Sequence, residues 1–164
     1  MRHERQVELL RRVERSGERL AGLHASTSRT NPASAYTDPE RFEREMRTLF
    51  RAGPVFFGLS ADLVEPGSYR SFRVDGIPLV VVRQPDGNLA AFVNACRHRG
   101  APLVETPATG DGLRAFNCPY HAWSYGLDGE LRSRPLSAGA FDDVTTDCDL
   151  IRRPVAERYG LIFV

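Results

Sequence analysis

C-R-H-R-G-A-P-L, from Cys96 to Leu103, and C-P-Y-H-A-W-S-Y-G-L-D-G-E-L, from Cys118 to Leu131, are the stretches of this sequence that predict its fold and chemistry. Each supplies one cysteine and one histidine close together: Cys96 with His98, and Cys118 with His121. A lone cysteine or histidine is more often structural, but here the pair recurs in two loops. Two thiolates and two imidazoles suit iron–sulfur or zinc chemistry. The sequence therefore predicts a metal centre.

Both stretches follow predicted β-strands. Short β-like runs broken by Gly, Pro and Asp are typical of strands in an antiparallel sandwich or small barrel. Pro85-Asp86-Gly87-Asn88 and Asp128-Gly129 are turn signals between such runs. The expected strands cover residues 55–59, 69–74, 79–83, 89–94, 113–117, 122–125, 131–133 and 161–164. We therefore expect a mainly β protein.

The first third of the chain is predicted to be helical rather than β-stranded. Apolar residues at helical spacing predict a helix over residues 5–23, followed by a Ser-, Thr- and Asn-containing linker over 22–35. Asp38 is a good N-cap and Pro39 suits the first helical position, so a second helix is expected to start there and to stop near Gly53-Pro54. The predicted organisation is a helical arm and linker (1–35) followed by a metal-binding β domain (36–164).

Zinc is the main alternative metal. Zinc sites usually carry Cys-x₂₋₄-Cys or His-x₃₋₅-His pairs, and this chain has neither spacing. Three cysteines are too few for a disulfide scaffold, and in a reducing compartment they favour metal or redox work. Cys148 is interpreted as a spare thiol. The residues thus favour an iron–sulfur centre and leave a structural zinc module as the less favoured alternative.

The two cysteine–histidine motifs resemble the cluster loops of Rieske non-haem iron oxygenases, and more narrowly the amino-terminal domain of aromatic-ring-hydroxylating oxygenase α subunits. The similarity extends through Y-T-D-P-E-R-F-E-R-E (36–45), P-G-S-Y-R-S-F (66–72) and Y-G-L-I-F-V (159–164), so it covers about residues 36–164. It implies a Rieske-type antiparallel β-sandwich with a cluster-binding subdomain, preceded by one or two N-terminal helices.

The resemblance also implies the cofactor, a Rieske-type [2Fe–2S] cluster. In such a centre two cysteines hold one iron and two histidines the other. The metal ligands implied here are Cys96, His98, Cys118 and His121, with Arg99, Tyr120 and Trp123 of the same motifs as further cofactor-binding residues.

Three positions in the motifs distinguish this chain within the family. Cytochrome bc-type Rieske proteins carry an extra cysteine in each loop, joined as a disulfide, where this chain has Ala101 and Tyr120. No such bridge can form here, which resembles the lower-potential oxygenase and ferredoxin type. The family usually has glycine after the second histidine, where this chain has Ala122.

By resemblance, the chain is part of an oxidoreductase, a dioxygenase or monooxygenase. A reductase or ferredoxin would reduce the cluster, which would pass the electron to a mononuclear iron in a catalytic domain of the same or a neighbouring subunit, within a homo-oligomer. Only His3 and His24 remain for that second iron. We therefore expect the catalytic domain to follow residue 164, and the chain alone not to hydroxylate a substrate. The alternative is a stand-alone Rieske ferredoxin-like electron carrier.

Composition fits a protein without nucleic-acid or membrane partners. The net charge is +1 over 164 residues, and no apolar run approaches the roughly 20 residues of a membrane span. The start M-R-H-E-R-Q lacks the hydrophobic stretch of a secretory signal. A cytoplasmic location is the expectation.

Overall fold

The computed structural model describes residues 3–17, 27–135 and 148–164. The chain divides into two compact units, Met1–Phe42 and Glu43–Val164, and each is considered by itself. The division predicted from sequence, at residue 35, stays a prediction.

The helices of the amino-terminal part partly match their predicted ranges. Helix α1 spans His3–Gly17, within the expected region, and the predicted continuation to residue 23 lies outside the described residues. A one-turn helix, α2 (Ser34–Thr37), overlaps the last two residues of the segment expected to be a linker. The prediction is wrong for Ser34 and Ala35, because the amide of Asp38 donates to the carbonyl of Ser34 at 3.0 Å and closes a turn.

The next helix begins as the sequence predicts. Asp38 caps α3 (Pro39–Glu45), since its Oδ1 accepts a hydrogen bond from the amide of Glu40 at 2.9 Å. The helix continues as a π-helical segment, η2 (Met46–Phe50), in which the amide of Arg51 reaches the carbonyl of Met46. It ends just before Gly53-Pro54, as expected.

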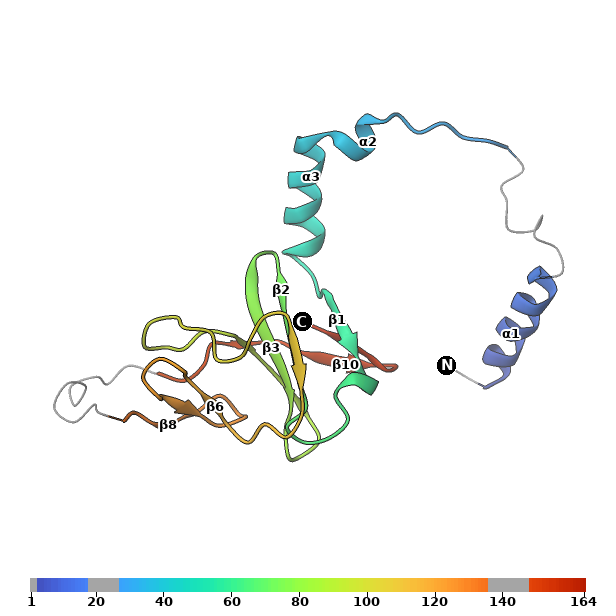
Figure 1. Cartoon of the computed structure of the whole chain (residues 1–164). Coiled ribbons are helices and arrows are strands. Elements are labelled where there is room, and N and C mark those ends of the chain that lie inside the picture. Colours follow the sequence, from blue (N-terminus) through green and yellow to red (C-terminus); the bar gives the residue numbers. More distant parts are fainter. Residues whose placement is uncertain (1–2, 18–26, 136–147) are drawn as a thin grey trace. The chain divides into compact units, whose positions relative to one another are not determined.

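The second unit is built from three antiparallel sheets (Figure 1). The largest has the order β5-β2-β3-β4-β9, the second β1-β11-β10 and the smallest β6-β7-β8. The strands are β1 (Phe56–Leu59), β2 (Tyr69–Val74), β3 (Ile77–Arg83), β4 (Leu89–Val93), β5 (Ala108–Gly110), β6 (Phe116–Asn117), β7 (Ser124–Tyr125), β8 (Leu131–Ser133), β9 (Arg152–Arg153), β10 (Ala156–Arg158) and β11 (Leu161–Phe163). A short 3₁₀ turn, η3 (Ser60–Asp62), follows β1. The mainly β antiparallel fold with a helix before it is confirmed.

Several strand boundaries differ from the prediction. Asp75 and Gly76 both have positive φ (49° and 78°), which makes the two-residue turn that matches strand twist, so β3 begins at Ile77 rather than Leu79. β5, β9 and β10 were not predicted. The expected strands at 113–117 and 122–125 shorten to two residues each, because the chain between them folds into a hydrogen-bonded loop.

Two separate hydrophobic clusters form the core. One contains Phe57, Leu63, Leu79, Val81, Ala91 and Ile162. The other contains Val80, Val82, Ala90, Phe92, Cys96, Leu103, Phe116, Cys118, Trp123, Tyr125, Leu127 and Leu150. Alternate residues of β3 therefore point into different clusters, as the two-residue period of a strand requires. Only the second cluster includes the predicted metal-ligand cysteines.

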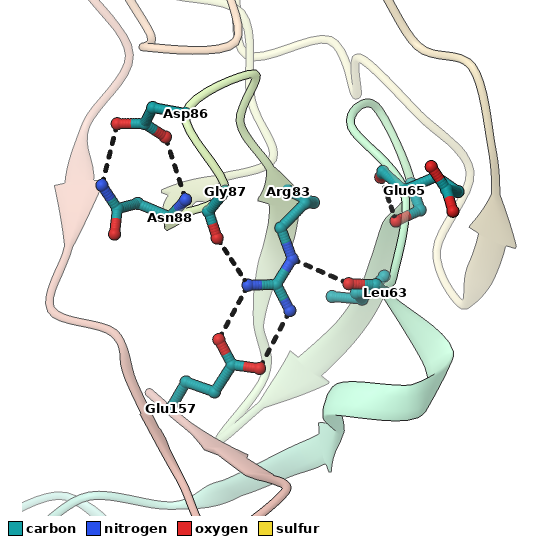
Figure 2. Close-up of polar contacts among 8 residues, drawn as sticks. Leu63, Glu65, Arg83, Asp86, Gly87, Asn88 and Glu157 are labelled. Atoms are coloured by element: carbon teal, nitrogen blue, oxygen red, sulfur yellow. Dashed lines mark hydrogen bonds and ion pairs between the residues drawn. The ribbon is translucent and has the colours of Figure 1, made fainter.

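Arg83 ties the two larger sheets together (Figure 2). Its side chain, 8% exposed, forms two hydrogen bonds of 2.7 and 2.9 Å with the carboxylate of Glu157 on β10. It also donates to the carbonyls of Leu63 and Gly87, each at 2.8 Å. One guanidinium on β3 thus joins β10, the segment before β2 and the β3–β4 turn. No helix among the described residues is long and apolar enough to cross a membrane.

Candidate metal centre

The two cysteine–histidine loops have equivalent backbones. In the first, the amide of Cys96 donates to the carbonyl of Ala101 at 2.8 Å, and the amide of Gly100 donates to the carbonyl of Cys96. In the second, Cys118 donates to Trp123 at 2.8 Å, and Ala122 donates to Cys118. Each cysteine therefore starts a six-residue loop that is closed by the same two hydrogen bonds. The residue before the closing position has positive φ in both, Gly100 at 73° and Ala122 at 56°.

A buried asparagine holds the far part of the first loop. Asn94, 1% exposed, follows β4 and accepts from the amides of Leu103 and Val104 at 3.0 and 3.1 Å. Its Nδ2 donates to the carbonyl of Val104 and to the hydroxyl of Thr106. Four hydrogen bonds from one side chain fix where this loop returns to the core. Sequence reasoning did not select Asn94.

Tyr125 is a second residue that the sequence analysis missed. Its hydroxyl lies 3.2 Å from the Sγ of Cys96 and 3.1 Å from the amide nitrogen of Arg97. The amide donates to the hydroxyl, so the phenolic proton is available to the sulfur. Burial, and then the hydrogen bond with Cys96, raise the pKa of Tyr125, which keeps that proton in place. The phenol is therefore placed to donate to a thiolate.

Both predicted cysteine ligands are buried side by side. Cys96 is 3% exposed and Cys118 is 5% exposed, in the same hydrophobic cluster. Burial raises the pKa of the Cys96 thiol above its ordinary value, with the hydrogen bond from Tyr125 acting in the opposite direction. A buried thiolate needs a compensating positive charge. A metal ion bound at the two sulfurs would provide one.

The two histidines meet at the same place. Their ring centroids lie 4.7 Å apart, and the Nδ1 atoms of both are buried. Nδ1 of His121 has no hydrogen-bond partner among the described residues. A buried nitrogen without a hydrogen-bond partner reduces the stability of the fold unless another group, such as a metal, uses its lone pair. Burial, followed by the nearby His121 and Arg99, lowers the pKa of His98, which favours the neutral imidazole that a metal ligand requires.

The other three predicted site residues differ in burial and in which histidine they contact. Trp123, 3% exposed, stacks on His98 with centroids 5.0 Å apart and planes 8° apart. Tyr120 is 59% exposed and its ring lies 3.9 Å from that of His121. Arg99 is exposed. Trp123 thus forms a wall behind the histidines, whereas Tyr120 covers their outer side.

The donor set fits a dinuclear cluster. Two cysteines and two histidines on paired loops can offer two ligands to each of two irons, the arrangement of a Rieske centre. None of the three cysteines, all of which are described, forms a disulfide.

Comparison with known proteins agrees with this geometry. Residues 54–148 match the family model described as the Rieske [2Fe-2S] domain. The α subunit of chlorobenzene dioxygenase from Cupriavidus sp. strain PS12 is 32% identical over 155 residues, which cover 94% of this chain and 34% of that protein. The oxygenase subunit of glycine betaine monooxygenase from Chromohalobacter salexigens is 38% identical over 138 residues, covering 81% and 29%. The chain thus spans about a third of the length of these relatives.

Solved structures of Rieske oxygenases are also similar to this chain. A quaternary ammonium Rieske monooxygenase in complex with L-carnitine superposes with a TM-score of 0.72 at 30% identity, over 82% of this chain and 38% of that one. Naphthalene 1,2-dioxygenase with indole bound superposes with a TM-score of 0.66 at 31% identity, over 76% and 28%.

Proposed function

This chain belongs to the Rieske [2Fe–2S] domain family, and from that premise we propose that it is the one-electron relay of an oxygenase large component. The observation that carries the proposal is that two buried cysteines share one hydrophobic cluster, while two histidine rings with buried Nδ1 atoms lie 4.7 Å apart, on loops of equivalent backbone. When bound there, a [2Fe–2S] cluster supplies a centre that accepts and releases single electrons.

Each residue has a defined task in this proposal. The thiolates of Cys96 and Cys118 would hold one iron of a bound cluster, and Nδ1 of His98 and of His121 would hold the other. Tyr125 keeps its proton and donates it toward the sulfur of Cys96, 3.2 Å away. Trp123 and the hydrophobic cluster around the sulfurs exclude water from the inner side, and among the described residues the half-buried histidines are the predicted ligands nearest to solvent.

The electron donor is a reductase or a ferredoxin, and the acceptor is a mononuclear iron in a catalytic domain of the same or a neighbouring subunit. Support comes from the relatives, which are named as oxygenase subunits and as large components of dioxygenase systems. One of the similar monooxygenase structures is described in connection with inter-subunit electron transfer. Homo-oligomerisation is therefore part of the proposal. A cytoplasmic location is also part of the proposal. It is supported by three cysteines that form no disulfide, as is usual in a reducing compartment.

The test is reconstitution with iron and sulfide under anaerobic conditions, followed by EPR spectroscopy of the dithionite-reduced protein. We expect two irons per chain and a rhombic signal of low average g, as mixed cysteine and histidine ligation produces. An EPR-silent protein that holds one zinc per chain would contradict the proposal and leave a structural metal domain.

A further inference from the structure

We propose that the surface formed by Arg97, Arg99, Tyr120 and Arg134 around the two histidines is the docking site for an acidic one-electron carrier protein. This inference rests on the proposed function and adds to it the position and the chemistry of the partner's contact.

The first observation is where the redox centre comes nearest to solvent. The cysteines are 3% and 5% exposed, whereas His98 and His121 are half-buried and in contact with each other. Tyr120, 59% exposed, lies over His121 with ring centroids 3.9 Å apart. A partner that must come close for electron transfer can therefore approach on the histidine side, and it meets an aromatic ring there. Exposed tyrosines are favoured contact residues in protein interfaces.

The second observation is the charge around that point. The two loops, residues 96–103 and 118–127, contain Arg97 and Arg99 and no acidic residue. Both arginines are exposed and flank His98, and Arg99 is close enough to lower its pKa. Arg99 forms no ion pair with a described residue. A third guanidinium, that of Arg134, lies 6.0 Å from the centroid of the Trp123 ring, which stacks on His98.

The third observation is that Arg132 offsets part of the neighbouring negative charge. Asp128 and Glu130 lie on the adjoining hairpin and both pair with Arg132, the latter at 3.0 Å. These three side chains together carry one negative charge, against the three positive charges of Arg97, Arg99 and Arg134. The charge next to the histidines is thus positive although the chain as a whole is nearly neutral, at +1. A positive patch at an electron-transfer site selects and steers a negatively charged partner.

The loops are also rigid enough to present these charges. The amide of Arg97 is held by the hydroxyl of Tyr125 at 3.1 Å, and the loop is closed from Cys96 to Ala101. A partner therefore meets the two guanidinium groups on a fixed backbone, so little ordering of the loop opposes association.

The experiment is stopped-flow reduction of the cluster-loaded protein by a reduced, acidic plant-type [2Fe–2S] ferredoxin. The rate constant should fall as ionic strength rises. The double variant Arg97→Glu, Arg99→Glu should reduce it at least tenfold at low salt. Arg97→Lys, Arg99→Lys should retain most of it. The control Arg153→Glu, Arg158→Glu reverses two exposed arginines on β9 and β10, changes the net charge by the same amount and should match the wild type.

The outcomes separate this inference from the one it rests on. A wild-type rate that does not change with salt, or equal rates in the charge-reversed and control variants, would overturn the docking site alone, provided that dithionite still gives the reduced cluster signal. A protein that takes up no cluster would overturn the proposed function and this inference together.

Discussion

The hydroxyl of Tyr125 lies 3.2 Å from the Sγ of Cys96, across 29 residues of sequence. The same hydroxyl accepts the amide hydrogen of Arg97, so the tyrosine joins β7 to the first cysteine–histidine loop. Hydrogen bonds to cluster sulfurs favour the reduced state because they stabilise its extra negative charge. The contact therefore has a measurable electrochemical consequence.

Tyr125→Phe should lower the midpoint potential of the reconstituted centre. Loss of one hydrogen bond to a charged sulfur corresponds to about 1.4 kcal/mol, or about 60 mV for a one-electron couple. EPR-monitored redox titration measures the shift. Tyr69→Phe is the control, because Tyr69 packs against the same hydrophobic cluster. An unchanged potential in Tyr125→Phe would show that the phenol does not donate to the sulfur.

Cys96→Ser and His121→Ala should each abolish normal cluster assembly, because each removes one of two protein ligands from an iron. The expected iron content falls well below two per chain, and the Rieske absorption and EPR features disappear. Cys148→Ser should load normally, since Cys148 lies outside both loops. A normal Rieske spectrum in either ligand variant would refute the assignment of that residue.

Ala122→Gly should stabilise the protein. Ala122 has φ 56°, at the position equivalent to Gly100 in the first loop. An alanine in the left-handed region costs about 1–2 kcal/mol, and the greater freedom of glycine in the unfolded chain offsets part of the gain. The net expectation is about 0.5–1 kcal/mol in urea unfolding of the metal-free protein.

The first loop provides the opposite substitution. Gly100→Ala places a methyl group where nothing lies within 4 Å, so only the backbone conformation opposes it. It should destabilise the protein by an amount similar to the gain in Ala122→Gly. Equal stabilities for all three proteins would mean that neither loop is held in the left-handed conformation in solution.

Glu157→Gln should destabilise the fold by about 2 kcal/mol, because Arg83 is left buried without its carboxylate partner. Urea unfolding should show a lower midpoint with an unchanged slope. Asp75→Asn, which breaks the more exposed pair with Arg51, should have a smaller effect. A larger loss in the Asp75 variant would contradict the assigned role of Arg83.

The same carboxylate predicts how stability depends on pH. The hydrogen bonds from Arg83 lower the pKa of Glu157 from 4.5 to about 2. A depressed pKa means that the stabilisation is complete above about pH 5 and is lost as the pH falls toward 2. Since Glu157 is one-third exposed, solvent screening limits this loss to about 2 kcal/mol. Glu157→Gln should flatten the acid limb of the stability curve; an unaltered limb would assign it to other carboxylates.

Sequence patterns predict the long strands better than the short ones. β2 and β3 carry runs of Val, Ile and aromatic residues, and the turn signals around them are strong. β9 and β10 are short segments of arginine, alanine and glutamate with no buried residue, so no alternation of buried and exposed positions reveals them. β9 pairs with β4, far away in the sequence, whereas β10 pairs with β11, the next strand along the chain.

The same distinction applies to the candidate site. Spacing alone selected the two cysteine–histidine pairs, which the structure brings together. Tyr125 and Asn94 escaped notice because their importance lies in contacts, one across 29 residues and the other back onto the returning loop. In the sequence, Ala122 differs from the glycine that is usual in the family. The structure adds that this residue has a positive φ.

The division of the core into two hydrophobic clusters bears on how the fold responds to loss of metal. The cluster around Phe57, Val81 and Ile162 contains none of the four predicted ligands, and the Arg83–Glu157 pair contains none of them either. Both loops are also closed by backbone hydrogen bonds that involve no metal. The iron-free protein is therefore expected to keep a folded scaffold with its two loops in place, ready to receive iron and sulfide.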